Sequence, residues 1–146
     1  MDRKGFTLIE LMLVISILGI FLLIPALKGT IASNFKERKE LRTFKKDIEY
    51  ARNRAIVEST MYSVYMNFED NFYCINKYED KEVVLKKYEF KNGIKLKGTK
   101  NMGNQLAFSY LGIPSKAGTI YLEDKNGDKI EITITPVTGK VNIYQK

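Results

Sequence analysis

The sequence contains no histidine, no tryptophan and a single cysteine, Cys74. Without histidine, a nucleophilic side chain has no imidazole base, which excludes a His-based catalytic triad. One cysteine cannot form an intrachain disulfide, and a Cys/His metal cluster lacks its ligands. We also find no phosphate-binding loop and no metal-ligand spacing. The sequence therefore argues against an enzyme, predicts no cofactor, and leaves Cys74 as a small buried residue of a strand.

Charge is scarce in the segment that follows Gly5. Residues 6–27 read FTLIELMLVISILGIFLLIPAL and carry one charged residue, Glu10. As a helix, this stretch would span about 33 Å, enough for a bilayer core. Arg3 and Lys4 precede it, and positive residues there predict a cytoplasmic N-terminus and an extracytoplasmic body. We therefore expect a transmembrane and assembly helix over residues 6–28, in a single-pass protein of the inner (cytoplasmic) membrane.

Three interpretations of this segment compete. A cleaved signal peptide has a similar basic start, but this apolar stretch is too long and no A-x-A site follows it. A plain signal anchor fits the length but does not explain Glu10. An acid inside a membrane helix costs about 2.5–3.5 kcal/mol at the centre and less near an end. A partner would offset that cost; the alternative is a side chain that reaches water at the interface.

The run Lys4-Gly5-Phe6-Thr7-Leu8-Ile9-Glu10, followed by apolar residues, resembles the class III signal of type IV pilins and type II secretion pseudopilins. The resemblance implies that residues 1–5 are a leader, cut by a prepilin peptidase between Gly5 and Phe6. It implies N-methylation of Phe6 and pairing of Glu10 with the amine of a neighbouring subunit. The implied partners are other pilins or pseudopilins, membrane lipid and, indirectly, an assembly platform protein and an ATPase. The subunit would finally join an extracellular or periplasmic filament.

The pattern beyond residue 28 is that of an amphipathic helix. One apolar stripe has spacings of three and four residues, as a helix face requires; it comprises Leu41, Phe44, Ile48, Ala51 and Ala55. We expect this helix to end near Glu58-Ser59-Thr60 and its stripe to pack on the subunit's own sheet, with a coiled-coil seam as the alternative. Charged residues are expected on the other faces; they are Lys36, Glu37, Arg38, Lys39, Glu40, Lys45, Lys46, Asp47 and Glu49.

After Thr60 the period becomes that of short strands. The predicted strands are residues 61–68, 71–78, 82–90, 94–96, 105–110, 118–123, 129–135 and 140–144. Lys91-Asn92-Gly93 is interpreted as the turn of a hairpin. A helix followed by strands predicts an α+β fold, a long N-terminal helix packed on an antiparallel sheet. Residues 29–146 would form the pilin-like head, which includes the second half of the helix.

The head carries a second resemblance. Residues 41–57, together with segments 108–112, 118–122, 132–136 and 138–141, resemble the helix and C-terminal strands of the GspH/FimT group of minor pseudopilins. Lys140 stands where that group usually has arginine. The resemblance implies a minor pilin or pseudopilin of a type IV pilus, a type II secretion system or a competence filament.

The alternative is a DNA-binding minor pilin at a filament tip. The net charge is +7, and residues 86–100 hold six lysines and one acid, Glu89. Lysines concentrated in this way can bind a phosphate backbone with strong salt dependence, although Lys-rich solvated strands are common. The candidate contacts are Lys86, Lys87, Lys91, Lys95, Lys97, Lys100 and Lys140.

Overall fold

The computed structural model describes residues 7–145, with side chains over residues 7–21 and 34–145. One helix, α1 (Leu8–Val57), is followed by eight strands. These are β1 (Met61–Asn67), β2 (Phe72–Tyr78), β3 (Glu82–Glu89), β4 (Lys95–Lys100), β5 (Gln105–Phe108), β6 (Gly118–Glu123), β7 (Lys129–Ile134) and β8 (Val141–Gln145). The chain divides into two compact units, Met1–Lys36 and Glu37–Lys146.

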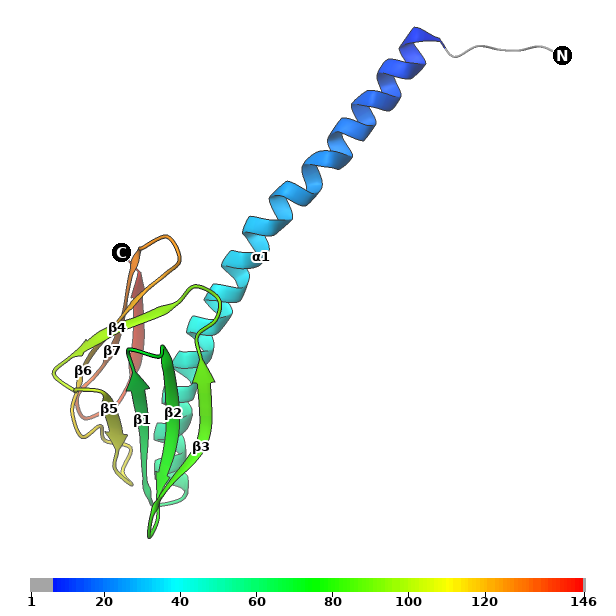
Figure 1. The fold of residues 1–146 in the computed structure, drawn as a ribbon. Helices are drawn as coiled ribbons and strands as arrows, with labels where there is room; N and C mark the ends of the chain where they lie inside the picture. Colours follow the sequence, from blue (N-terminus) through cyan, green and yellow to red (C-terminus); the bar gives the residue numbers. More distant parts are fainter. Residues whose placement is uncertain (1–6, 146) are drawn as a thin grey trace. The chain divides into compact units, whose positions relative to one another are not determined.

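The second unit is built from two antiparallel sheets beside the C-terminal part of α1 (Figure 1). One sheet has the strand order β3-β2-β1-β5 and the other β4-β6-β7-β8. All pairings between neighbouring strands are antiparallel. The predicted α+β class is confirmed, and each predicted strand matches an observed one, with different ends in most cases.

The hairpin predicted at Lys91-Asn92-Gly93 is wrong. β3 pairs with β2, and β4 pairs with β6, so this segment crosses from one sheet to the other. The side chain of Glu40 accepts hydrogen bonds from the backbone N–H groups of Lys91 (2.8 Å) and Asn92 (3.1 Å). Asn71 accepts from the Leu96 N–H and donates to the Ile94 carbonyl, both at 2.8 Å. These contacts replace the strand partners that a hairpin would have supplied.

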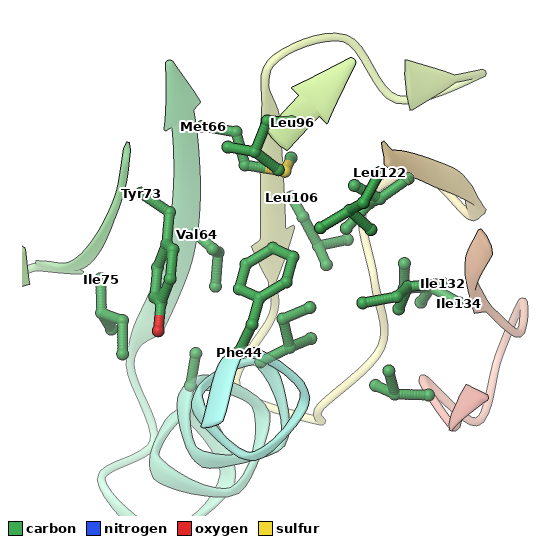
Figure 2. Close-up of a cluster of buried hydrophobic side chains, with 14 of the residues drawn as sticks. Phe44, Val64, Met66, Tyr73, Ile75, Leu96, Leu106, Leu122, Ile132 and Ile134 are labelled. Atoms are coloured by element: carbon green, nitrogen blue, oxygen red, sulfur yellow. The ribbon is translucent and has the colours of Figure 1, made fainter. Parts of the chain in front are cut away.

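The apolar stripe of α1 fills the space between the sheets. Phe44, Ile48, Ala51 and Ala55 are fully buried, and Leu41 is 6% exposed. Figure 2 shows the Phe44 ring directed among side chains of both sheets, which include Val64, Tyr73, Leu106 and Leu122. The Phe44 and Tyr73 ring centroids lie 4.6 Å apart. The stripe therefore packs on the subunit's own strands, as predicted, and is not a coiled-coil seam.

Three of the charged helix residues expected at the surface are buried: Glu37, Glu40 and Asp47. Asp47 accepts a hydrogen bond from the Tyr73 hydroxyl at 2.5 Å and pairs with the Lys86 amine at 2.6 Å. The expectation failed because Glu37, Glu40 and Asp47 lie seven, four and three residues from Phe44, on its own helix face. A buried carboxylate is tolerated where donors meet it, and the strands supply donors to Glu40 and Asp47.

The helix ends at Val57, close to the predicted end. Ser59 adopts a left-handed conformation (φ 50°), and the Thr60 N–H donates to the Ala55 carbonyl at 3.2 Å. This bond closes the last turn as a helix C-terminal motif does, here without the usual glycine.

Cys74 lies in β2 and is 8% exposed, and burial raises the pKa of its thiol. A thiol kept protonated by its surroundings is a poor nucleophile. Its packing in the strand confirms the interpretation of Cys74 as a small buried residue.

Candidate assembly site and lysine surface

The described part of the N-terminal motif begins with a helix cap. Thr7 immediately precedes α1, and its hydroxyl accepts a hydrogen bond from the Glu10 N–H at 3.4 Å. In return, Oε2 of Glu10 accepts from the Thr7 N–H at 3.4 Å. This reciprocal pattern is a capping box, which satisfies two of the amides that a helix start leaves free. Gly5 and Phe6, the residues expected at the cleavage site, lie outside the described residues.

The Glu10 carboxylate remains available to another molecule. The side chain is exposed, and within residues 7–145 it has no salt-bridge partner. Its position in the first turn is electrostatically favourable, because the helix dipole places partial positive charge there. Both capping bonds are long, at 3.4 Å, so little hydrogen-bond energy would be lost if a cation drew the carboxylate away from them. The capping role was not predicted, although the T-x-x-E spacing of Thr7 and Glu10 is the sequence signature of a capping box.

The helix surface from Leu8 to Phe21 is apolar on every side, apart from Glu10. Its large side chains are between 48% and 77% exposed; they are Leu8, Ile9, Leu11, Met12, Leu13, Val14, Ile15, Ile17, Leu18, Ile20 and Phe21. A contiguous apolar surface of this kind marks contact with lipid or with another protein.

Over the described residues, no helical stretch is both long and apolar enough to qualify as a membrane span.

The structure distributes the seven candidate lysines over two sheets and two connecting segments. Lys86 and Lys87 lie on β3, whereas β4 carries Lys95, Lys97 and Lys100. Along β4 the exposed Lys95 and Lys97 alternate with the buried Leu96. Lys91 lies in the crossover segment and Lys140 between β7 and β8. The seven side chains therefore do not line one surface strand.

Three carboxylates pair with four of these lysines. Lys86 pairs with Asp47 at 2.6 Å and Lys97 with Glu123 at 2.9 Å. Glu89 lies 3.5 Å from Lys91 and 3.9 Å from Lys87. Within residues 7–145, Lys95, Lys100 and Lys140 have no ion-pair partner. Nucleic-acid contact by these lysines stays a prediction, and the pairing weakens the electrostatic field on which it depends.

Two open clefts contain part of this lysine set. One, of about 440 Å³, is lined by Lys87 and Lys91 together with Glu40 and Glu89. The other, of about 450 Å³, is lined by Lys95 and Lys97 together with Glu69. Both place carboxylates beside the amines, which would repel a phosphate. Within the described chain, no cluster of three acidic or thiol side chains is placed to hold a metal ion.

Comparison with known proteins adds two findings. Residues 1–24 match the model of the prokaryotic N-terminal methylation motif. Pilins with this motif are anchored in the inner membrane before filament assembly. A search of the curated proteins gives no match.

Solved structures resemble about three quarters of this chain. One is the minor pseudopilin EpsH from the type 2 secretion system of Vibrio cholerae (TM-score 0.61, 13% identity), with 75% of this chain and 96% of EpsH covered. Another is the type IV minor pilin FimU of Pseudomonas aeruginosa (TM-score 0.59, 15% identity), with 73% of this chain and 91% of FimU covered. At these identities the likeness shows the fold, which is that of minor pilins and pseudopilins.

Proposed function

We propose that this type IV pilin-like chain, which carries the methylation motif and has the minor pilin fold, is a minor pilin or pseudopilin subunit of a membrane-rooted filament. One observation carries the proposal. From Leu8 to Phe21, α1 is apolar on every side and bears one acid, Glu10, which caps the helix start but has no ionic partner within residues 7–145. Such a surface is stable only when lipid or other subunits cover it.

Maturation would proceed at the motif. A prepilin peptidase would cut between Gly5 and Phe6, and the new amine on Phe6 would be methylated. Before assembly, residues 6–28 would cross the inner membrane once, with the N-terminus in the cytoplasm and the head outside. Pilins are structural subunits, so an ATPase and a platform protein would supply the energy and the base for assembly, and no step requires catalysis or a cofactor from this chain.

Glu10 would direct assembly. The amine of a neighbouring subunit would supply the positive partner that the carboxylate lacks within residues 7–145. In a low-dielectric bundle of apolar helices this attraction is much stronger than in water. The pair would be lost if either charge were removed, so the amine on Phe6 has to be exposed by cleavage first. The order of events, trimming before stacking, follows from this electrostatic requirement.

The machine could be a type II secretion pseudopilus, a type IV pilus or a competence filament. EpsH is described as part of the first and FimU as part of the second. The fold that this chain shares with both supports a role in one of these machines. It does not favour one machine over another.

The proposal is tested by the mass of the mature protein. The full chain is co-expressed with a prepilin peptidase, extracted from membranes and measured by intact mass spectrometry. We expect a polypeptide that begins at Phe6 and carries one added methyl group. A Gly5→Val variant should retain the leader. The β-branched side chain would keep the backbone at the cleavage site from approaching the peptidase closely. A wild-type chain that still begins with Met1 would refute the proposal.

A further inference from the structure

Two turns of the head pack on the C-terminal end of α1. The Arg52 Nε donates to the carbonyl of Gly112, in the turn after β5, at 3.2 Å. A Cβ atom on Gly112 would lie 2.6 Å from the Ile56 side chain, and one on Gly139, between β7 and β8, would lie 2.9 Å from Arg52. Both glycines also have a positive φ, of 72° and 61°. Glycine is therefore required at this junction by conformation and by close approach.

Large apolar side chains are exposed at the junction. Tyr110 and Leu111, directly before Gly112, are each 60% exposed, and Ile113, directly after it, is 40% exposed. Ile56, against which Gly112 packs, is 42% exposed. Turns normally carry small or polar residues. Adjoining exposed apolar side chains mark a contact with another molecule. We name Ile56, Tyr110, Leu111 and Ile113 the junction patch.

The segments that form the junction are basic and contain no acid. They are residues 50–57, 109–117 and 135–140, and their charged residues are Arg52, Arg54, Lys116 and Lys140. Arg54 pairs with Glu58 at 3.1 Å. The other three have no ion-pair partner within residues 7–145. The junction patch therefore adjoins positive charge that the described chain does not balance.

The two lysines lie at one end of the second sheet. Gly118, at the start of β6, pairs with Ile134 at the end of β7, and Ile134 pairs with Val141 at the start of β8. The residues just before β6 and just before β8 are consequently at the same end of the sheet. Lys116 and Lys140 occupy these positions, and both are exposed.

Arg52 is held in an orientation that suits a carboxylate. Its Nε is bound to the Gly112 carbonyl, and no acceptor within residues 7–145 meets its two Nη groups. The side chain is partly buried, so one end is fixed while the other is accessible. A guanidinium binds a carboxylate through two parallel N–H bonds, and an ordered side chain loses little freedom when it does so.

We propose that the junction patch binds a segment of a different filament subunit that combines aliphatic side chains with carboxylates, one of which pairs with Arg52. The aliphatic side chains would cover Ile56, Leu111 and Ile113, and the carboxylates would meet the unbalanced cations. The inference rests on the proposed function, since it names the chemistry of a neighbour in the filament. A contact between unlike subunits is complete after one pair, as a minor subunit requires.

Two other occupants fit the junction patch less well. A second copy of this chain carries the same net charge of +7 and would be repelled. A nucleic acid would use the cations, because its backbone is bound through charge, but it would leave the apolar side chains in water. Only a partner with both chemistries covers the whole surface.

The test is a photochemical cross-link in the full chain, produced in its native host. Photoreactive benzoylphenylalanine replaces Leu111, and the cross-linked peptides are identified by mass spectrometry. We expect one predominant product, in which the linked peptide belongs to a different pilin-like chain and carries both aspartate or glutamate and aliphatic residues. A product with a second copy, with nucleic acid or with a peptide that lacks acids would overturn the proposal, and so would the absence of a product.

Charge variants test the role of the cations in the same cross-link. Arg52→Gln should lower the yield about tenfold, as expected for loss of a hydrogen bond between charged groups, and Arg52→Lys should restore part of it. Lys140→Glu should lower the yield several-fold without a change at Arg52. The matched control is Lys129→Glu, at the other end of β7, which should have no effect. An unchanged yield in Arg52→Gln, or equal losses in Lys140→Glu and Lys129→Glu, would contradict the proposed pairing.

The N-terminus of the mature chain separates this contact from the filament role. A chain that begins at Phe6 but gives no cross-linked product refutes only the contact. A retained Met1 refutes the filament role.

Discussion

The two parts of α1, Leu8–Phe21 and Glu37–Val57, differ in where their apolar side chains lie: they are exposed in the first and buried against the strands in the second. Over Leu8–Phe21, every large apolar side chain is about half exposed or more, and the one acid serves as a helix cap. From Glu37 to Val57, one narrow stripe is buried against the strands, and the acids beside it contact groups of the head. The same secondary structure therefore serves contacts between molecules in its first part and contacts within the molecule in its second.

The difference shows where the chain's stability is located. Side chains in the second part contribute to folding of the head, because they leave water when the strands pack on them. Side chains in the first part contribute to folding only when lipid or another subunit covers them. Substitutions in the two parts should consequently affect different measurements.

The largest effect on folding is expected from Phe44→Ala. Removal of a fully buried ring should lower the free energy of unfolding of the head by about 3–5 kcal/mol. Ile15→Ala, in the exposed first part of α1, should change it by less than about 0.5 kcal/mol. Denaturant unfolding of the full chain in detergent, followed by circular dichroism, measures both. Equal effects of the two variants would contradict the division of α1.

A smaller loss is expected from Asp47→Ala. The substitution leaves the buried Tyr73 hydroxyl without its acceptor and Lys86 without its ion-pair partner. An unsatisfied buried polar group costs about 1–3 kcal/mol. The burial of Tyr73 and the Asp47 carboxylate both hold the pKa of this tyrosine above its ordinary value. Asp47→Ala should therefore also lower the pKa of Tyr73 in an ultraviolet titration. A loss of stability with an unchanged tyrosine pKa would contradict the contact between Asp47 and Tyr73.

These acids also show what the sequence could and could not predict. The apolar stripe and the eight strands were recognisable because periodicity records which face is buried. The burial of Glu40 and Asp47 was not, since a charge in a helix is usually solvated and its donors lie on strands far along the chain. The sheet assignment failed at Lys91-Asn92-Gly93 for the same reason: a local turn pattern carries no information on Glu40 and Asn71, which hold that segment.

Ionisation of Glu37 is expected to lower the stability of the head, whereas ionisation of a well-paired acid raises it. Burial and the nearby Asp124 raise the pKa of its carboxyl above the ordinary 4.5, and Oε2 has no hydrogen-bond partner within the described chain. A raised pKa in the folded state means that ionisation opposes folding, so stability falls as pH rises from 4.5 through the raised pKa. Glu37→Gln should increase the melting temperature at pH 7 and remove this part of the pH dependence. A lower melting temperature at pH 7 would refute the sign.

The smallest effect is expected from Glu49→Gln. Glu49 faces solvent on the second part of α1 and pairs with Lys45 at 3.7 Å. An exposed pair at this helical spacing is worth about 0.3–0.5 kcal/mol. The melting temperature of the full chain should therefore fall only slightly in Glu49→Gln. The difference from the wild type should be smaller still in high salt. A loss above about 1 kcal/mol would mean that the solvated face of this helix also packs on the head.

The most direct test compares two neutralised acids on one helix. Glu10→Gln and Glu49→Gln each remove one carboxylate from α1, and the amount of each variant in sheared, sedimented filaments is measured against the membrane pool. We expect Glu10→Gln to be trimmed and folded but nearly absent from filaments, and Glu49→Gln to enter them as the wild type does. Normal incorporation of Glu10→Gln would contradict the claim that the first part of α1 serves contacts between subunits.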